Sequence, residues 1–209
     1  TSFNLLQLFS ATLALRPLLR LKTKDYEEIE QKYITLQDTF ITEKPTEFDI
    51  EYEEYLSSIK TALFFSDWIE EKSEEFLLEK YDARPGEIRE KLEKIDWICY
   101  ATLELSKMLQ LRKASAEIHK LRVRLEYGAR EELLPLLKLK NIGKIRARKL
   151  FNNKIKDIGD VKKADLATLT QLLGPAITID IKKQVGENVE NLEIKPTKRK
   201  GQMSLGKYA

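Results

Sequence analysis

The chain has 209 residues, of which 42% are hydrophobic and 34% charged, so it is long enough for one large domain or two small ones with a real core. Its single cysteine, Cys99, excludes an internal disulfide and favours a reducing compartment. No apolar run is long enough to span a bilayer and no signal peptide opens the chain, so we expect a soluble, cytoplasmic protein. The first residue is Thr1 rather than methionine, and we therefore expect a fragment.

The net charge of +3 conceals a strong polarity along the chain. Residues 23–104 hold 23 acidic and 10 basic side chains, whereas residues 105–209 hold 11 acidic and 24 basic ones. A basic half beside an acidic half indicates that one end meets a polyanion. The alternative is a dipolar surface without a partner, and the charge pattern alone does not decide between the two.

Helical periodicity with few glycines and prolines predicts an all-α protein, a helical bundle followed by a small helix-hairpin-helix domain. We expect bundle helices over residues 2–13, from 17 on, 23–40, 49–71, 73–81, 87–111 and 114–127. Ser73 is a suitable N-cap for one of these helices, and Gly128 can terminate the last. The expected domains are residues 1–128, a bundle, residues 129–195, a set of short helices, and residues 196–209, a flexible basic tail.

The helix expected from Glu87 carries a lone tryptophan on its polar side. At 100° per residue, Trp97 falls about 180° from the apolar stripe that includes Ile88 and Ile95. An exposed indole there is suited to stacking on an unpaired base. Alternatively, another helix of the bundle covers Trp97, which is the better default because large aromatic side chains mostly fill cores.

Residues 139–150 show the most informative local pattern. We expect the turn Asn141-Ile142-Gly143 to follow a helix, with Gly143 at positive φ and the small Ala147 allowing a close helix crossing. The pattern resembles a helix-hairpin-helix motif, in which backbone N–H groups at the start of the second helix hold a phosphate. The basic residues placed to add charge are Lys140, Lys144, Arg146 and Arg148. The competing interpretation is a tight helical turn with solvated lysines.

A second hairpin is indicated at residues 172–177. Gly174 is in place, but Pro175 has no N–H group to donate, and Thr178 occupies the position of the small alanine. We therefore expect this half to be structural and to bury the apolar face of the first hairpin.

Eight segments spread over essentially the whole chain resemble archaeal DNA helicases of superfamily 2, the Ski2-like group of the Hjm type. These segments are residues 13–18, 60–63, 67–72, 85–88 with 96–97, 122–124, 127–128, 130–134 and 142–152. The resemblance implies that residues 1–128 are a ratchet domain and residues 129–195 a helix-loop-helix domain. It implies an ATP-dependent enzyme that translocates 3′ to 5′ on single-stranded DNA and acts in replication-fork repair and recombination.

The same resemblance implies that Trp97 and Arg89 contact the translocating strand and that the last domain grips emerging single strand and restrains the motor. The implied partners are single-stranded or forked DNA and the motor domains of the same polypeptide, with ATP and magnesium as cofactors of that parent. No Gly-x-x-x-x-Gly-Lys-Ser/Thr loop occurs here, so we expect no cofactor, no catalytic residue and no unwinding from this chain alone. The alternatives are a free-standing helix-hairpin-helix DNA-repair protein and a protein-interaction module.

The C-terminal tail partly fits a sliding-clamp-binding box. Gln202, Leu205 and Tyr208 match it, but Ala209 replaces the second aromatic residue, so a basic tail without that function is the alternative. The single histidine, His119, and the single cysteine lie far apart in sequence, so we expect no metal site.

Overall fold

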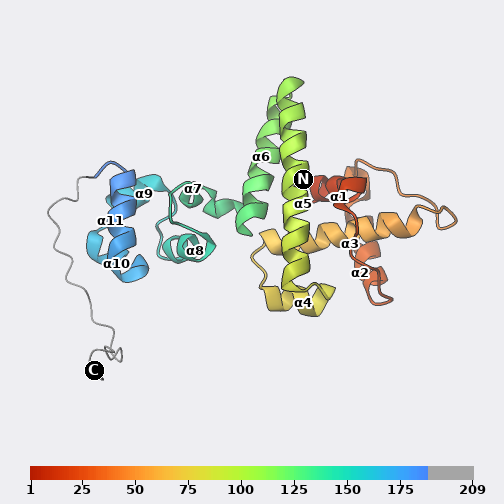
Figure 1. The fold of residues 1–209 in the computed structure, drawn as a ribbon, viewed down its shortest axis with the longest axis horizontal. Helices are drawn as coiled ribbons and strands as arrows, with labels where there is room; N and C mark the ends of the chain where they lie inside the picture. The colour runs from red at the N-terminus through yellow and green to blue at the C-terminus, as the bar shows by residue number, and fades with distance from the viewer. Residues whose placement is uncertain (188–209) are drawn as a thin grey trace, which may run out of the picture. The chain divides into compact units, whose positions relative to one another are not determined.

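The computed structural model describes residues 1–187, apart from the side chain of Asp38, and every regular element in this range is a helix (Figure 1). The predicted all-α fold class is confirmed for these residues. The chain divides into two compact units, Thr1–Leu134 and the residues from Pro135 on, which we describe separately as unit 1 and unit 2.

Unit 1 is a bundle of six α-helices with three short 3₁₀ segments. The α-helices are α1 Ser2–Ser10, α2 Asp25–Leu36, α3 Tyr52–Ile69, α4 Glu74–Tyr81, α5 Pro85–Met108 and α6 Arg112–Tyr127, and the 3₁₀ segments are Leu13–Leu15, Gln37–Thr39 and Glu131–Leu133. α5 lies along α6, and α1 packs on α3 (Figure 1). The core contains the fully buried Leu6, Ile59, Phe64, Phe65 and Ile95. Burial of these apolar faces provides most of the driving force for the bundle.

The helix expected from Pro17 is wrong, because side chains of distant helices take the backbone groups that a helix would use. The N–H of Leu19 donates to Thr61 Oγ1 of α3 at 3.1 Å, and Lys91 Nζ of α5 donates to the carbonyl of Pro17 at 2.7 Å. Leu19 is buried and anchors this irregular segment on the bundle. The backbone is thus hydrogen-bonded without forming a helix.

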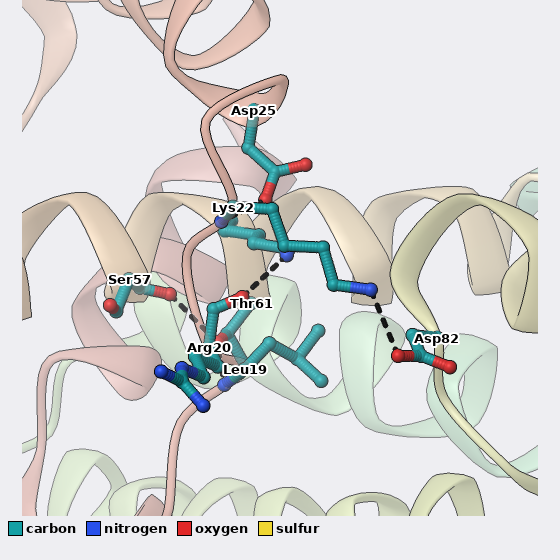
Figure 2. Close-up of polar contacts among 8 residues, drawn as sticks. Leu19, Arg20, Lys22, Asp25, Ser57, Thr61 and Asp82 are labelled. Atoms are coloured by element: carbon teal, nitrogen blue, oxygen red, sulfur yellow. Dashed lines mark hydrogen bonds and ion pairs between the residues drawn. The ribbon is translucent and has the colours of Figure 1, made fainter.

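A buried lysine fastens the same segment further along. Lys60 Nζ of α3 donates to the carbonyl of Arg20 and to Asp25 Oδ2, both at 2.6 Å, and its side chain is only 3% exposed. Next to it, Lys22 reaches Asp82 Oδ2 at 2.8 Å (Figure 2). A buried ammonium group needs such partners because burial removes its hydration.

Two helix ends form as the sequence predicts. Ser73 accepts the N–H of Phe76 through its hydroxyl at 3.2 Å and so caps α4, and Gly128 ends α6 in the left-handed conformation with φ of 58°. Gly128 lies against the ring of Trp68, whose Nε1–H donates to the carbonyl of Leu125 at 2.7 Å. The first helix ends earlier than expected, at Ser10.

Unit 2 consists of short helices joined by tight turns. They are α7 Leu134–Leu137, which begins at the last residue of unit 1, α8 Lys144–Asn152, α9 Ile158–Lys163, α10 Leu166–Leu173 and α11 Pro175–Gln184. α10 packs on both α8 and α11, and the core includes Leu139, Ile142, Ala147, Leu150 and Leu169. Within residues 1–187, no helix has both the length and the apolar character that a bilayer crossing requires.

Candidate nucleic-acid interface

The turn before α8 has its left-handed residue at Asn141 and not at Gly143. Asn141 has φ of 64°, whereas Gly143 is extended with φ of −94° and ψ of −179°, so the expected positive φ at Gly143 is wrong. Asparagine tolerates the left-handed region better than most residues because its side chain forms local hydrogen bonds. Here Asn141 Nδ2 donates to Asp180 Oδ2 of α11 at 2.8 Å.

Further bonds hold this turn in shape. The N–H of Lys140 donates to Gln184 Oε1 at 2.7 Å, and Gln184 Nε2 donates back to the carbonyl of Lys140 at 3.2 Å. Arg146 Nη1 donates to the carbonyl of Asn141 at 2.9 Å. The sequence analysis missed the roles of Asp180 and Gln184, because no local pattern links them to a turn 39 and 44 residues away.

The start of α8 is open on the side of Gly143. This glycine is the N-cap and so offers no side-chain acceptor to the first-turn N–H groups, which an α-helix leaves without intrahelical partners. A Cβ atom built on Gly143 would meet nothing within 4 Å. The side chain of Ile142 is buried in the core, so this residue can contribute only its backbone to a ligand. Within the part of the chain that the structure describes, the space beside Gly143 at the positive end of this nine-residue helix is therefore open.

Basic side chains surround this helix start. Lys140, Arg146 and Lys149 are exposed, while Lys144 and Arg148 are partly buried. The Arg148 guanidinium also lies over the Phe151 ring, 5.3 Å from its centre. Over residues 135–187 there are twelve basic and five acidic side chains, so this surface attracts anions.

The second glycine turn differs from the first in conformation. Gly174 has φ of 85° and precedes Pro175, the first residue of α11. Thr178 is fully buried, and its hydroxyl donates to the carbonyl of Gly174 at 2.9 Å. The polar group at the alanine position is thus satisfied inside the fold, and Gly174 is the glycine that needs its conformational freedom.

In unit 1, the other two candidate residues lie on α5. Trp97 is 62% exposed and lies on the side of α5 opposite the buried Ile88 and Ile95. Within residues 1–187 no other helix buries its ring, so the alternative that a bundle helix covers Trp97 is wrong. The Arg89 side chain is 83% exposed and forms an ion pair with Glu93 at 3.1 Å. The pairing leaves little net charge on this part of α5, so an interaction with Trp97 would depend mainly on its ring.

A second aromatic residue on α5 escaped the sequence analysis. Tyr100, one helical turn after Trp97, is 48% exposed, and the Arg122 guanidinium of α6 lies 5.2 Å from its ring centre. Arg122 also binds Asp96 through two bonds of 2.7 and 2.9 Å, and this carboxylate raises the pKa of Arg122. The sequence signal for Tyr100 was its position three residues after Trp97, because residues at this spacing are neighbours on the surface of a helix.

A hollow of about 600 Å³ in unit 1 is lined by residues of α3, α4, α5 and α6, and neither Trp97 nor Tyr100 is among its lining residues. Its lining includes Trp68, Ile88, Arg89, Leu92, Asp96 and Arg122. The lining combines apolar side chains with opposite charges, so it lacks the uniformly basic character of a phosphate site.

Two other sequence expectations concern chemistry away from these surfaces. Cys99 is buried, and burial raises the pKa of its thiol to about 12, while His119 is exposed. Within the described range, no three His, Cys, Asp or Glu residues are grouped so that they could hold a metal ion. The proposed clamp-binding residues Gln202, Leu205 and Tyr208 lie outside the described residues.

Comparison with known proteins identifies the family of this chain. Residues 3–128 match the model of the family described as archaeal helicase, domain 4. The chain belongs to this family. The general resemblance to archaeal Ski2-like helicases is therefore confirmed, whereas the Hjm type is not distinguished.

Several similar proteins carry the name ATP-dependent DNA helicase Hel308, and three of them show the extent of the match. The protein from Methanococcus vannielii is 38% identical over 158 residues, which are 75% of this chain and 20% of that protein. The protein from Methanocella arvoryzae is 32% identical over 90% of this chain and 26% of its own length. The protein from Thermococcus kodakarensis is also 32% identical, over 96% of this chain and 18% of its own length. The chain thus spans about a fifth to a quarter of these relatives.

Proposed function

We propose that this chain is the C-terminal, DNA-handling region of a longer ATP-dependent helicase that moves 3′ to 5′ on single-stranded DNA during replication-fork repair and recombination. The family match supports this assignment, as does the alignment of 75% and 90% of this chain with two relatives named as helicases. In this proposal residues 1–128 are the ratchet domain and residues 129–195 a helix-hairpin-helix DNA-binding domain. The motor of the longer protein would bind ATP and magnesium.

The observation that carries the proposal is the open N-terminus of α8. Its first-turn N–H groups and the positive end of the helix dipole can hold a phosphate. Because Gly143 has no side chain, a nucleic-acid backbone can come close to these groups. The exposed Lys140 and Arg146 add a charge-based attraction that is independent of base sequence.

On α5, we propose that the exposed Trp97 stacks on a base of the translocating strand. Stacking of one base on an aromatic side chain contributes about 1–3 kcal/mol and tolerates any base. Arg89 is the neighbouring candidate, although its ion pair with Glu93 must loosen before it can bind a phosphate. The paired charges around Trp97 provide no excess of positive charge for a phosphate contact on this face, so base stacking is its main contribution.

Substitution of Gly143 by alanine tests the site on α8. The extended φ and the open space around Gly143 predict little change in stability. The added methyl group should nevertheless keep a phosphate away from the N–H groups and weaken binding of a fluorescein-labelled oligo-dT strand by about tenfold, since one charge-assisted contact is lost. Fluorescence anisotropy measures the affinity, and thermal unfolding measures the stability.

Matched variants distinguish local contact from general charge. Lys140→Gln removes an exposed charge beside the turn but keeps the backbone bonds to Gln184, so it should weaken binding. Lys24→Gln removes one charge from an exposed position of unit 1 and should leave binding unchanged. If Gly143→Ala binds the strand as tightly as the unmodified chain at low salt, the proposed phosphate site is wrong.

Trp97→Ala tests the second contact. Because the indole is mostly solvent-exposed, the variant should unfold within about 0.5 kcal/mol of the unmodified chain and bind the strand about tenfold more weakly. A large loss of stability would instead assign Trp97 to packing.

A further inference from the structure

The loop between α2 and α3 presents two large apolar side chains to solvent. Phe48 is 98% exposed and Ile50 is 96% exposed, the highest values among the large hydrophobic side chains of the described residues. The loop leaves the bundle and returns at the start of α3 (Figure 1). Single exposed apolar residues are common, but two large apolar side chains that lie two residues apart in one loop and are both almost fully exposed offer a surface suited to burial against another molecule or domain.

The tip of this loop, residues 46–51, has a defined shape. Asp49 Oδ2 accepts the N–H of Thr46 at 2.6 Å and its hydroxyl at 2.8 Å. The N–H of Asp49 donates to the carbonyl of Thr46 at 2.9 Å, and the N–H of Tyr52 donates to the carbonyl of Asp49 at 3.1 Å. Two consecutive turns therefore hold Phe48 and Ile50 at the tip before any partner binds, which lowers the entropy cost of docking.

The stem of the loop is fastened to unit 1. Lys44 Nζ lies 4.7 Å from the ring centre of Tyr33 and 5.6 Å from that of Tyr52, and it approaches Glu30 at 3.4 Å. The hydroxyl of Thr42 donates to Gln7 Oε1 at 3.2 Å. The loop is thus a projection with a fixed base, and we call residues 46–51 the hook.

The charges around the hook determine what it can bind. Residues 43–54 carry one basic side chain, Lys44, which already contacts Glu30. They also carry six acidic side chains, Glu43, Glu47, Asp49, Glu51, Glu53 and Glu54. This density of negative charge repels a DNA backbone. The complementary surface is an apolar groove on a protein, rimmed by lysine or arginine side chains.

We propose that the hook docks into such a basic-rimmed apolar groove on another domain of the same helicase and fastens unit 1 to that domain. This inference rests on the proposed function, because it requires the longer polypeptide. The matched relatives are about four to six times longer than the segment they share with this chain, so in the proposed longer protein most of the domains that could cover unit 1 lie outside this segment. A contact within one polypeptide also explains why two large side chains can be kept at a loop tip without constant exposure to water.

Hydroxyl-radical footprinting with mass spectrometry tests the proposal directly. The 209-residue chain and the full-length helicase are labelled in parallel, and the oxidation rate of Phe48 is compared. We expect the rate in the full-length protein to be at least about fivefold lower, because docking removes this nearly fully exposed ring from solvent. Phe64, which is fully buried, should stay unlabelled in both proteins and so report that unit 1 is folded.

Two pairs of variants identify the chemistry of the contact. In the full-length helicase, Ile50→Ser should raise the oxidation rate of Phe48 towards that of the 209-residue chain, whereas Ile34→Ser, at an exposed position of α2, should not. Glu47→Lys should likewise raise this rate by weakening attraction to the basic rim. The matched control Glu79→Lys, at an exposed position of α4, should leave the rate low.

The outcomes separate this inference from the proposed function. Equal oxidation of Phe48 in the 209-residue chain and in a full-length helicase that unwinds DNA would overturn the inference and leave the proposed function intact. An encoded polypeptide without motor motifs would overturn the proposed function and the docking inference together.

Discussion

The contact between Gly128 and Trp68 makes the end of α6 sensitive to a single methyl group. Gly128 has φ of 58°, and a Cβ atom there would lie 2.7 Å from Cε2 of the Trp68 ring. A left-handed alanine costs about 1–2 kcal/mol. The ring cannot move away freely, because its Nε1–H donates to the carbonyl of Leu125, a bond that contributes about 1 kcal/mol. Alanine restricts the unfolded chain more than glycine does, and this effect offsets up to about 1 kcal/mol of the cost.

We therefore expect Gly128→Ala to lower the free energy of unfolding by about 2 kcal/mol and the melting temperature by about 7 °C. Circular dichroism with thermal and urea unfolding measures both quantities. Gly86→Ala is the matched control, because Gly86 lies in the first turn of α5 with no atom within 4 Å of an added Cβ, and it should raise stability slightly.

A double-mutant cycle with Trp68→Phe separates the steric contribution from the backbone conformation. Phenylalanine lacks the ring atoms that the new methyl group would strike, so the cost of Gly128→Ala should be smaller in that background. Loss of less than about 0.5 kcal/mol in the single variant Gly128→Ala would refute the reasoning, since neither the strain nor the overlap would then be present.

Three further changes test other parts of the fold. Lys60→Ala should lower the free energy of unfolding by about 3 kcal/mol in urea titrations, because it leaves the largely buried Asp25 carboxylate without its ion-pair partner, and a neutral result would contradict this. Asn141→Ala should destabilise unit 2 by about 2 kcal/mol, seen as faster hydrogen exchange in α8, since it loses the bond to Asp180 and retains the left-handed φ. The Cys99 thiol, with its pKa raised to about 12, should react with Ellman's reagent at about pH 8 only as fast as the protein opens, whereas immediate reaction would show an accessible thiolate.

Local sequence patterns predicted much of the fold because the interactions that produce it are local. The i, i+3, i+4 spacing of apolar residues indicated α3, α5 and α6, and the Ser73 hydroxyl caps the helix that begins next to it. The buried Leu139, Ile142 and Leu150 are apolar at the positions that the hairpin pattern requires. These features depend on neighbours within a few turns and can be inferred without knowledge of the tertiary structure.

The errors lie where distant partners determine the backbone. Residues following Pro17 have an apolar pattern suited to a helix, but Thr61 and Lys91, which are 42 and 74 residues away from their bonding partners, hold them in an irregular conformation. At the turn before α8, Asn141 rather than Gly143 takes the left-handed conformation, and Asp180 of α11 holds its side chain. Neither α3 nor α11 can be placed against these segments from local spacing, so the sequence alone could not show which residue would take the special conformation.

The distribution of charge has a consequence for how the two proposed contacts should respond to salt. On α5, Glu93 pairs with Arg89 and Asp96 pairs with Arg122, so the Trp97 face has little net charge to attract phosphates. In unit 2, by contrast, residues 135–187 carry twelve basic and five acidic side chains, and this excess of positive charge includes the residues around the start of α8. Release of counterions by about four phosphate contacts would lower single-strand affinity about 50-fold between about 50 and about 200 mM salt, and this loss should originate almost entirely in unit 2. The contribution of Trp97 should persist at high salt because stacking does not depend on counterion release. The strand would then be held by charge at one contact and by stacking at the other, an arrangement in which neither contact depends on base sequence.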